Sequence, residues 1–341
     1  MRLVKVEDIK QNMELAKPIY KEGAVLLTAQ DKNLYSYKNR LLKLDINYVY
    51  VKDEISHDIE VNDVVSQETR AEGRQIVKKF FADIEAEAKP DLQEISSYAS
   101  SLIDEILTNK NIIVNMLDIK STDNYTFAHC VNVAVLSILI GVKAKFNRKK
   151  LEKLALGALT HDVGKISIPE DILLKPDKLT IEEYEIIKKH PRLGYERLKS
   201  LPEMTPTTLS VILAHHENYK GGGYPKGISK EEIHSFPRIV AIADVFDALT
   251  SNRVYREPWP TKKALEYIYA ESNKKFDPEY VKLFTKYIPL YPNGTEVELS
   301  TGEKALVIRQ NKNFPARPVI RKLSSKEEID LLQNQDITIV T

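Results

Sequence analysis

The stretch ALTHDVGK, from Ala158 to Lys165, decides the fold, because it ends an apolar helical run that begins near Leu151. Adjacent residues of a helix point about 100° apart, so His161 and Asp162 reach one centre only if that centre is large or double. A carboxylate can bridge two cations with its two oxygens, which makes Asp162 a candidate bridge. A histidine–aspartate pair is also common at surfaces and helix caps, so the residues elsewhere in the chain must decide between the two interpretations.

Five of the seven histidines in the chain belong to one ordered series of metal-type ligands. The series is His129, His161 with Asp162, His190, the pair His215 and His216, and finally Asp244. Imidazole nitrogen and carboxylate oxygen are donors that suit manganese, iron, nickel or zinc. Because the adjacent ligands point in different directions, the series predicts a centre with two metals.

The members of the series differ in how well the local sequence supports them. His215 and His216 splay apart on a helix and are seldom both useful to a hydrophobic core, so both are predicted ligands. Asp244 lies in the apolar helix predicted over 239–249, where an unpaired buried carboxylate would be costly; a polar helix face toward water is the alternative. A hydrogen-bonded core histidine explains His129 equally well, and its place in the order favours a ligand.

A glycine-rich loop, from Gly221 to Pro225, follows the histidine pair. Glycines let the backbone approach a ligand closely, and Tyr224 could stack on a base or hydrogen-bond to a phosphate. A plain surface turn explains this stretch equally well. The loop is therefore a candidate part of the site because it lies beside predicted ligands.

The composition limits the class of protein. With 50 lysine and arginine residues against 49 aspartate and glutamate residues, the net charge of +1 creates no overall attraction to nucleic acid polymers or acidic membranes. The amino terminus lacks the apolar core of a signal peptide, and the most apolar run, 131–142, is too short to cross a bilayer. The single cysteine, Cys130, cannot form an intrachain disulfide and fits a reducing compartment. We therefore expect a cytoplasmic protein that binds neither a nucleic acid polymer nor a membrane.

Changes of pattern divide the 341 residues into four expected regions. They are a small, partly β N-terminal module (1–60), a helical connector (61–118), a helical catalytic domain (119–290) and a small β C-terminal module (291–341). Strand-like runs of the terminal modules lie at 24–27, 48–51, 295–299, 304–309 and 318–323. In the connector, apolar residues recur at three- and four-residue steps over 76–84 and 92–106, which predicts amphipathic helices broken near Pro90. Packing within the chain is favoured over joining two subunits, and a homodimer through the connector is left open.

The motifs HD with GK, KHP, HHE, GGGYP and ADVFDALTSNRVYR occur in this order over residues 119–290. This set resembles the HD-GYP family of cyclic di-GMP phosphodiesterases, and several linked motifs are far more specific than any one of them. The resemblance implies a mainly α fold, with a helical HD-domain bundle between small β-containing N- and C-terminal modules. It also implies hydrolysis of cyclic di-GMP to linear pGpG, and often on to GMP, with divalent metals that are usually iron or manganese.

The resemblance further implies roles for individual residues. One metal would be held by His129, His161, Asp162 and Asp244, and the other by Asp162, His190, His215 and His216. Lys165 would contact the scissile phosphate and stabilise the charge added there. Arg253, Arg256 and Tyr224 would bind and orient the dinucleotide. Some members carry a glutamate four positions before the first histidine and bind a third metal; Tyr125 stands there in this chain, which favours two.

The mechanism expected from these roles is metal-assisted hydrolysis, in which a hydroxide bridging two cations attacks phosphorus in line. Asp162 and Lys165 are the expected catalytic residues, and Asp247, on the same helical face as Asp244, is expected to support the ligands. The alternatives are a catalytically silent cyclic di-GMP receptor and an HD phosphohydrolase of another cyclic dinucleotide or of a nucleoside phosphate. The terminal modules are possible binding sites for partner proteins. No sensor motif in them identifies an input signal.

Overall fold

The computed structural model describes the chain except for residues 22–23, 30–32, 45, 62, 110–124, 176, 252–257, 312–313 and 341. The described residues form two compact units. The first is drawn from 1–67 and 285–341, and the second from 68–110 and 124–284. Both ends of the chain therefore belong to one unit, and the boundaries of the four expected regions stay predictions.

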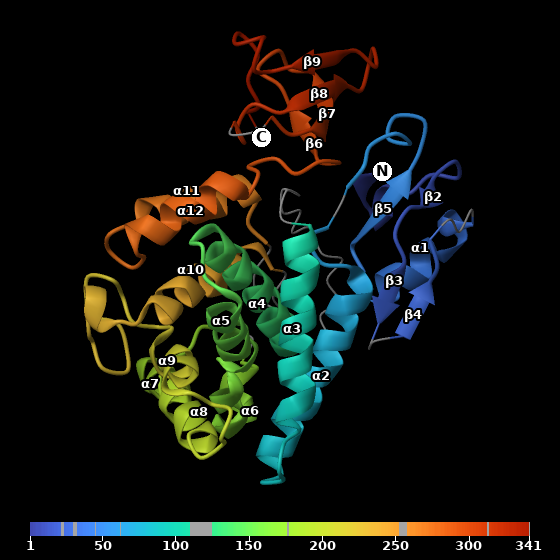
Figure 1. Ribbon diagram of the computed structural model, residues 1–341. Coiled ribbons are helices and arrows are strands. Elements are labelled where there is room, and N and C mark those ends of the chain that lie inside the picture. Colours follow the sequence, from blue (N-terminus) through green and yellow to red (C-terminus); the bar gives the residue numbers. More distant parts are fainter. Residues whose placement is uncertain are drawn as a thin grey trace. The chain divides into compact units, whose positions relative to one another are not determined.

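The second unit is built from helices (Figure 1). Its α-helices are α2 (Gln67–Glu85), α3 (Leu92–Thr108), α4 (Tyr125–Lys143), α5 (Arg148–Thr160), α6 (Glu170–Leu173), α7 (Ile181–Ile187), α8 (His190–Leu198), α9 (Pro206–Ala214), α10 (Ser235–Thr250), α11 (Thr261–Ala270) and α12 (Pro278–Tyr287). Two short 3-10 helices, η2 (Val163–Ser167) and η3 (Lys230–Glu232), lie between them. The expected mainly α fold with small sheets near the two ends is confirmed.

The helix α4 packs against α5 and α10 in the middle of the second unit. Its residues Thr126–Lys143 have a mean hydropathy of 1.7 over 18 residues, which is enough length and apolarity to cross a membrane. Within the unit, 72% of this window is buried, as the central helix of a bundle requires. The expectation that the apolar run is too short to span a bilayer is therefore wrong as to length, because the helix begins before residue 131.

The two connector helices pack on the rest of the second unit. Glu85 ends α2, and the Asp91 side chain caps α3 by accepting a backbone hydrogen bond, so the expected helices and the break near Pro90 are confirmed. Phe81 of α2 packs edge-to-face on Phe127 of α4, with ring centroids 5.7 Å apart. Packing within the chain accounts for these helices, and a homodimer through them stays a prediction.

The first unit contains one α-helix and three small antiparallel sheets among its described residues. Its elements are β1 (Arg2–Lys5), η1 (Val6–Asp8), β2 (Glu14–Leu15), β3 (Ile19–Lys21), β4 (Ala24–Leu27), α1 (Leu34–Lys43), β5 (Tyr48–Lys52), β6 (Glu296–Glu298), β7 (Lys304–Arg309), β8 (Val319–Lys322) and β9 (Glu328–Asp330). The strand orders are β1-β5-β2, β3-β4 and β6-β7-β8-β9. The strand-like runs expected from the sequence are confirmed.

The sheets near the two ends share a hydrophobic cluster because successive strand residues point to opposite faces. In β5, Val49 packs into the N-terminal core, whereas Tyr50 points to the other face. In β7, Val307 packs into the C-terminal core, and Leu306 joins the same cluster as Tyr50. Each sheet thus buries one face in its own core and the other in a core that both ends of the chain share.

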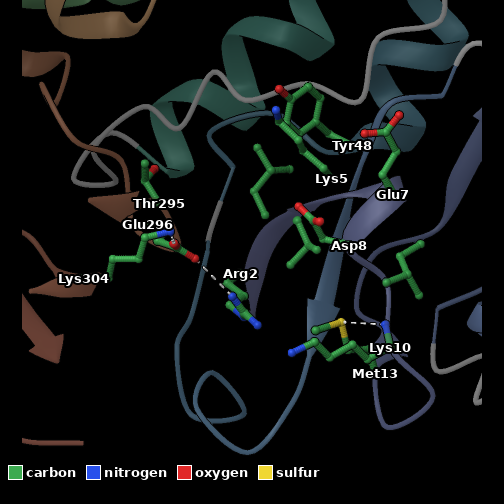
Figure 2. A pocket seen from close by; sticks show the side chains of 13 residues that line it. Arg2, Lys5, Glu7, Asp8, Lys10, Met13, Tyr48, Thr295, Glu296 and Lys304 are labelled. Atoms are coloured by element: carbon green, nitrogen blue, oxygen red, sulfur yellow. Dashed lines mark hydrogen bonds and ion pairs between the residues drawn. The ribbon is translucent and has the colours of Figure 1, made fainter. Parts of the chain in front are cut away.

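A cavity of about 770 Å³ in the first unit is lined by residues from both ends of the chain (Figure 2). Arg2 pairs with Asp53 at 2.8 Å and with Glu296 at 3.5 Å. Lys304 pairs with the same glutamate at 3.0 Å. Glu296 therefore pairs with a cation from each end of the chain, and these ion pairs add to the contact between the two ends.

Candidate metal centre

Most of the predicted ligands lie where helices of the second unit end, whereas His129 and Asp244 lie inside α4 and α10. His161 and His215 are the C-terminal caps of α5 and α9, and His190 follows the end of α7. The expectation that His161 and Asp162 lie at the end of a helical run is confirmed. His215 and His216, expected on a helix, instead follow the last residue of α9. The aligned peptide dipoles leave about half a negative charge at a helix C-terminus, which favours cations nearby.

Each of these three imidazoles is oriented by a carbonyl at the end of the preceding helix. The Nδ1 atoms donate to carbonyl oxygens at 2.7 Å (His161 to Ala158), 2.8 Å (His190 to Ile187) and 3.0 Å (His215 to Val211). The last carbonyls of a helix have lone pairs that the helix leaves unused, so they can accept from these rings. Because a carbonyl only accepts, Nδ1 carries the hydrogen, and Nε2 of a neutral ring presents its lone pair.

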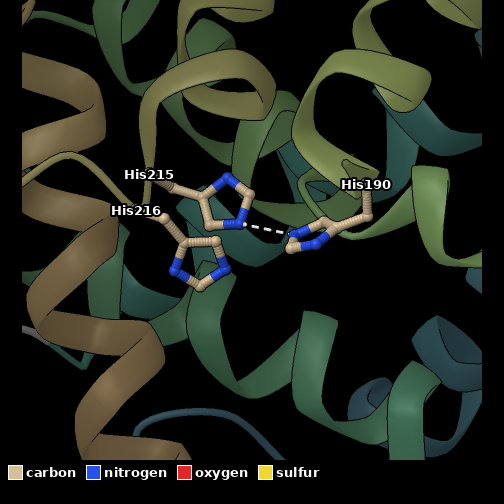
Figure 3. A group of neighbouring side chains, drawn as sticks. All are labelled: His190, His215 and His216. Atoms are coloured by element: carbon tan, nitrogen blue, oxygen red, sulfur yellow. Dashed lines mark hydrogen bonds between the residues drawn. The ribbon is translucent and has the colours of Figure 1, made fainter. Parts of the chain in front are cut away.

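The lone pairs on Nε2 converge in a way that fits a metal ion. His190 Nε2 lies 3.3 Å from His215 Nε2 (Figure 3), although neither nitrogen has a hydrogen to share. His161 Nε2 is buried and has no hydrogen-bond partner among the described residues. Burial lowers the pKa of His161 to about 4 and that of His190 to about 3, so both rings are neutral near pH 7. Neutral imidazoles with converging lone pairs are the donors that a divalent cation requires.

The carboxylate of Asp162 lies between two groups of imidazoles. Its Oδ2 is 3.5 Å from Nε2 of His161 and 3.8 Å from Nε2 of His129. Its Oδ1 is 3.4 Å from Nε2 of His190 and 4.0 Å from Nε2 of His215. Two groups that could hold metal ions result: His129, His161 and Asp162 in one, and His190, His215 and His216 in the other.

Asp244, in α10, contacts both groups as well. Its Oδ1 lies 3.1 Å from Nε2 of His129, and its Oδ2 lies 3.8 Å from Nδ1 of His216. Burial acts to raise the pKa of Asp244, but the contact with His129 holds it well below its usual range. Asp244 therefore points to the predicted ligands and not to water, which leaves the alternative of a solvated helix face without support.

Lys165, in η2, adds a positive charge beside Asp162. Its Nζ lies 2.5 Å from Oδ2 of Asp162, and its side chain is 27% exposed. Burial acts to lower the pKa of Lys165, but the neighbouring carboxylate raises it above its ordinary value. The ammonium is therefore charged at neutral pH and sits at the edge of the two groups.

The glycine-rich loop lies against the second group. The Tyr224 ring stacks on the His216 ring, with centroids 4.7 Å apart and planes at 28°. The Glu217 carboxylate accepts hydrogen bonds from the backbone N–H of Lys226 at 2.7 Å and of Gly227 at 3.1 Å. The loop is thereby fixed to the turn that carries the histidine pair, and the alternative of a plain surface turn does not describe it.

Some residues named in the sequence analysis lie outside the described residues, and one neighbour of the predicted ligands was not predicted from the sequence. Arg253 and Arg256 fall outside the described residues, as does the side chain of Tyr125. Asn132 was missed, although its amide donates to Oδ1 of Asp247 at 2.9 Å. Asp247 itself is placed as expected, since its Oδ2 accepts from Nδ1 of a predicted ligand at 2.7 Å.

Gly164 lies where η2 meets α8, and its replacement by alanine is expected to disturb the site. A Cβ atom there would lie 1.9 Å from the carbonyl oxygen of His190 and 2.6 Å from the backbone nitrogen of Gly194. Overpacking of this kind costs about 1–3 kcal/mol, and it would move His190 away from Asp162. We expect a lower melting temperature and less bound metal, measured by thermal unfolding and elemental analysis.

The control for this substitution is Gly302→Ala in the first unit. Gly302 has φ +79° and open space around the added atom, so alanine strains the backbone by about 1–2 kcal/mol without touching a predicted ligand. Bound metal should stay unchanged in that variant. A Gly164→Ala protein that keeps its full metal content would contradict the close packing of η2 on α8.

The family described as HD domain matches residues 107–280, which is just over half of the chain. The chain belongs to the HD-domain family. The family resemblance expected from the ordered motifs is thereby confirmed.

Named relatives of this HD-domain chain act on cyclic dinucleotides. It is 34% identical over 230 residues to a cyclic di-GMP phosphodiesterase of Pseudomonas aeruginosa, covering 66% of this chain and 55% of the relative. It is 31% identical over 188 residues to a 3'3'-cGAMP-specific phosphodiesterase of Vibrio cholerae, covering 54% of this chain and 36% of the relative. The HD-domain chain thus spans about half of the first relative and about a third of the second.

A solved structure has the same fold as this HD-domain chain. It is described as an HDG"Y"P protein from Bdellovibrio bacteriovorus, and it is 19% identical. The TM-score is 0.56, and the match covers 83% of this chain and 97% of the other. At this identity the match supports the fold alone.

Proposed function

We propose that this chain hydrolyses cyclic di-GMP to linear pGpG with two divalent metal ions. The observation that carries the proposal is the placement of Asp162, whose two carboxylate oxygens face two different groups of buried imidazoles. A hydrolase that uses two cations at one phosphate needs ligands that keep the cations a few ångströms apart. The relative named as a cyclic di-GMP phosphodiesterase supports the choice of substrate.

The donor set fits the two ions. Two cations, when bound, would supply an acidified water for attack and positive charge against the phosphate. We assign one ion to His129, His161, Asp162 and Asp244, and the other to Asp162, His190, His215 and His216. These nitrogen and oxygen donors, with no thiolate among them, suit iron or manganese.

The remaining residues would bind the substrate. Lys165 is proposed to contact the scissile phosphate, because its ammonium lies beside the carboxylate that faces both groups. The stacked ring of Tyr224 offers a surface held in place by His216, on which a base or sugar could rest. Arg253 and Arg256 are proposed to hold phosphates, since the planar guanidinium matches phosphate oxygens with two parallel donors.

A substrate panel tests the proposed function. Protein purified without oxygen and loaded with iron or manganese is incubated with cyclic di-GMP, 3'3'-cGAMP or pGpG, and products are separated by chromatography. We expect cyclic di-GMP to be cleaved fastest, with kcat/KM at least about tenfold above that for 3'3'-cGAMP, and pGpG to form before GMP. Elemental analysis of the same samples should give two metal ions per chain.

The rival functions give different results in the same panel. Tight binding of cyclic di-GMP without release of pGpG would identify a receptor and overturn the proposal. Faster cleavage of 3'3'-cGAMP would move the activity to the substrate named for the Vibrio cholerae relative. Cleavage of nucleoside phosphates alone would assign the site to a different class of HD phosphohydrolase.

A further inference from the structure

A line of buried hydrogen bonds leads from α2 to the predicted ligand His129. The Arg70 guanidinium donates from Nη1 to Oδ1 of Asn132 at 2.6 Å. The Asn132 amide donates from Nδ2 to Oδ1 of Asp247 at 2.9 Å, and Oδ2 of Asp247 accepts from Nδ1 of His129 at 2.7 Å. The four side chains are between 1% and 5% exposed.

The guanidinium sets the direction of this line. Arginine has only donors, so the Asn132 amide must turn its oxygen toward Arg70 and its NH₂ group toward Asp247. An ionised carboxylate only accepts, so Nδ1 of His129 carries the hydrogen. The Nε2 atom of His129 then faces Asp244 and Asp162, at 3.1 Å and 3.8 Å from their oxygens.

The charges at the two ends of the line stabilise each other. An isolated buried guanidinium or carboxylate would cost several kcal/mol. Here the positive Arg70 and the negative Asp247 are joined through the single amide of Asn132. Displacement of Arg70 would leave the Asp247 carboxylate buried without this compensating charge. The first turn of α2, which carries Arg70, is therefore energetically coupled to His129, which Asp247 holds.

The position of Arg70 on α2 is itself fixed by close packing on α3. The Tyr98 hydroxyl donates to the carbonyl oxygen of Thr69 at 3.0 Å. A Cβ atom on Gly73 would lie 2.0 Å from that same hydroxyl, so only glycine allows the helices to approach this closely here. These two contacts bracket Arg70 and hold it over Asn132.

The helix α2 lies outside the matched HD domain, which begins at residue 107. Arg70 is the fourth residue of α2, close to residue 67, where the N-terminal segment of the first unit ends. We propose that Arg70 is a positioning residue of the metal centre, which holds His129 in place through Asn132 and Asp247 and makes α2 part of the catalytic apparatus. This inference rests on the proposed function for its effect on hydrolysis, but its effect on cation binding can be measured independently.

The experiment compares Arg70→Met, Arg70→Lys and Arg74→Met in the full chain. Titration calorimetry with Mn²⁺ alone measures the affinity of each site, and Co²⁺ absorption spectra report the surroundings of the ion. We expect Arg70→Met to weaken one Mn²⁺ site about 10–100-fold, the usual effect of losing a residue that supports a metal ligand, and to leave the other within about threefold. Arg70→Lys, which keeps a charged donor, should restore most of the affinity.

Arg74, one turn later on the same helix, is the matched control, and its replacement should leave both sites unchanged. If Arg70→Met does not fold, Arg70→Gln, which keeps an N–H donor without the charge, allows the same comparison. Two Mn²⁺ sites of parental affinity in the Arg70→Met or Arg70→Gln variant would overturn the inference, as would equal weakening by Arg74→Met.

The readouts separate this inference from the proposed function. A parent chain that cleaves no cyclic dinucleotide, with the same loss at one Mn²⁺ site in Arg70→Met, would refute the function and leave the positioning role standing. An active parent whose Arg70→Met variant keeps both its Mn²⁺ affinities and its kcat would refute the positioning role alone.

Discussion

Replacement of Asp162 by alanine is expected to abolish hydrolysis and to lower the bound metal below two ions per chain. The two carboxylate oxygens of Asp162 face different groups of imidazoles, and Asp162 is assigned to both proposed ions, so its loss removes a ligand from each. Cations at a phosphoryl centre contribute several kcal/mol to transition-state stabilisation, which corresponds to a loss of at least about a thousandfold in kcat/KM. The measurements are product release and elemental analysis on the same preparation.

Two further variants show whether the loss arises from the metal centre. Asp171→Ala removes an exposed carboxylate from α6 and should leave both metal content and activity at the parental level. Asp162→Asn keeps the shape of the side chain without its charge, so it should retain more metal than the alanine variant and little more activity. Full activity of Asp162→Ala with two metal ions bound would refute the bridging role.

The sequence predicted the elements of the fold better than their association. Helices and longer strands follow the local spacing of apolar residues, so α2, α3, β4, β5, β6, β7 and β8 were predictable. The strands β1, β2, β3 and β9 were not among the predicted runs. The shared core of the first unit was not, because Tyr50 and Leu306 meet only after two distant segments fold together. Apolar residues at successive positions of a strand indicate that both of its faces are apolar, but they do not identify what covers the second face.

The candidate site was predictable where its residues carry chemistry that a hydrophobic core seldom uses. The histidines and aspartates of the series are rare enough in apolar helices to be noticed, and the structure brings all seven together. Arg70 and Asn132 could not be found this way, since both are common on solvated helix faces. Arg70 and Asn132 lie 62 residues apart along the chain, and they come into contact only because α2 packs beside α4.

Replacement of Lys165 by methionine is expected to lower kcat by about 10²–10³-fold with little change in KM. Removing one positively placed donor from a site of developing negative charge typically costs this much. Methionine keeps most of the length and apolar surface of the lysine side chain, and 27% exposure leaves room for it. Steady-state kinetics with cyclic di-GMP and elemental analysis measure the two effects separately, and Lys153→Met, at an exposed position of α5, is the control.

The metal content decides between two roles for this lysine. Its ammonium lies 2.5 Å from Oδ2 of Asp162, so it could act on the substrate phosphate or could serve only to neutralise the carboxylate. A residue that only neutralised Asp162 would, once removed, leave a more negative site that binds cations at least as tightly, and kcat would be preserved. Loss of a phosphate-binding residue would instead reduce kcat while two metal ions remain bound.

The Lys165→Arg variant tests whether charge at the phosphate is what matters. Because the raised pKa keeps Lys165 charged at neutral pH, this variant should then retain part of the activity. Parental kcat in Lys165→Met would contradict the catalytic role.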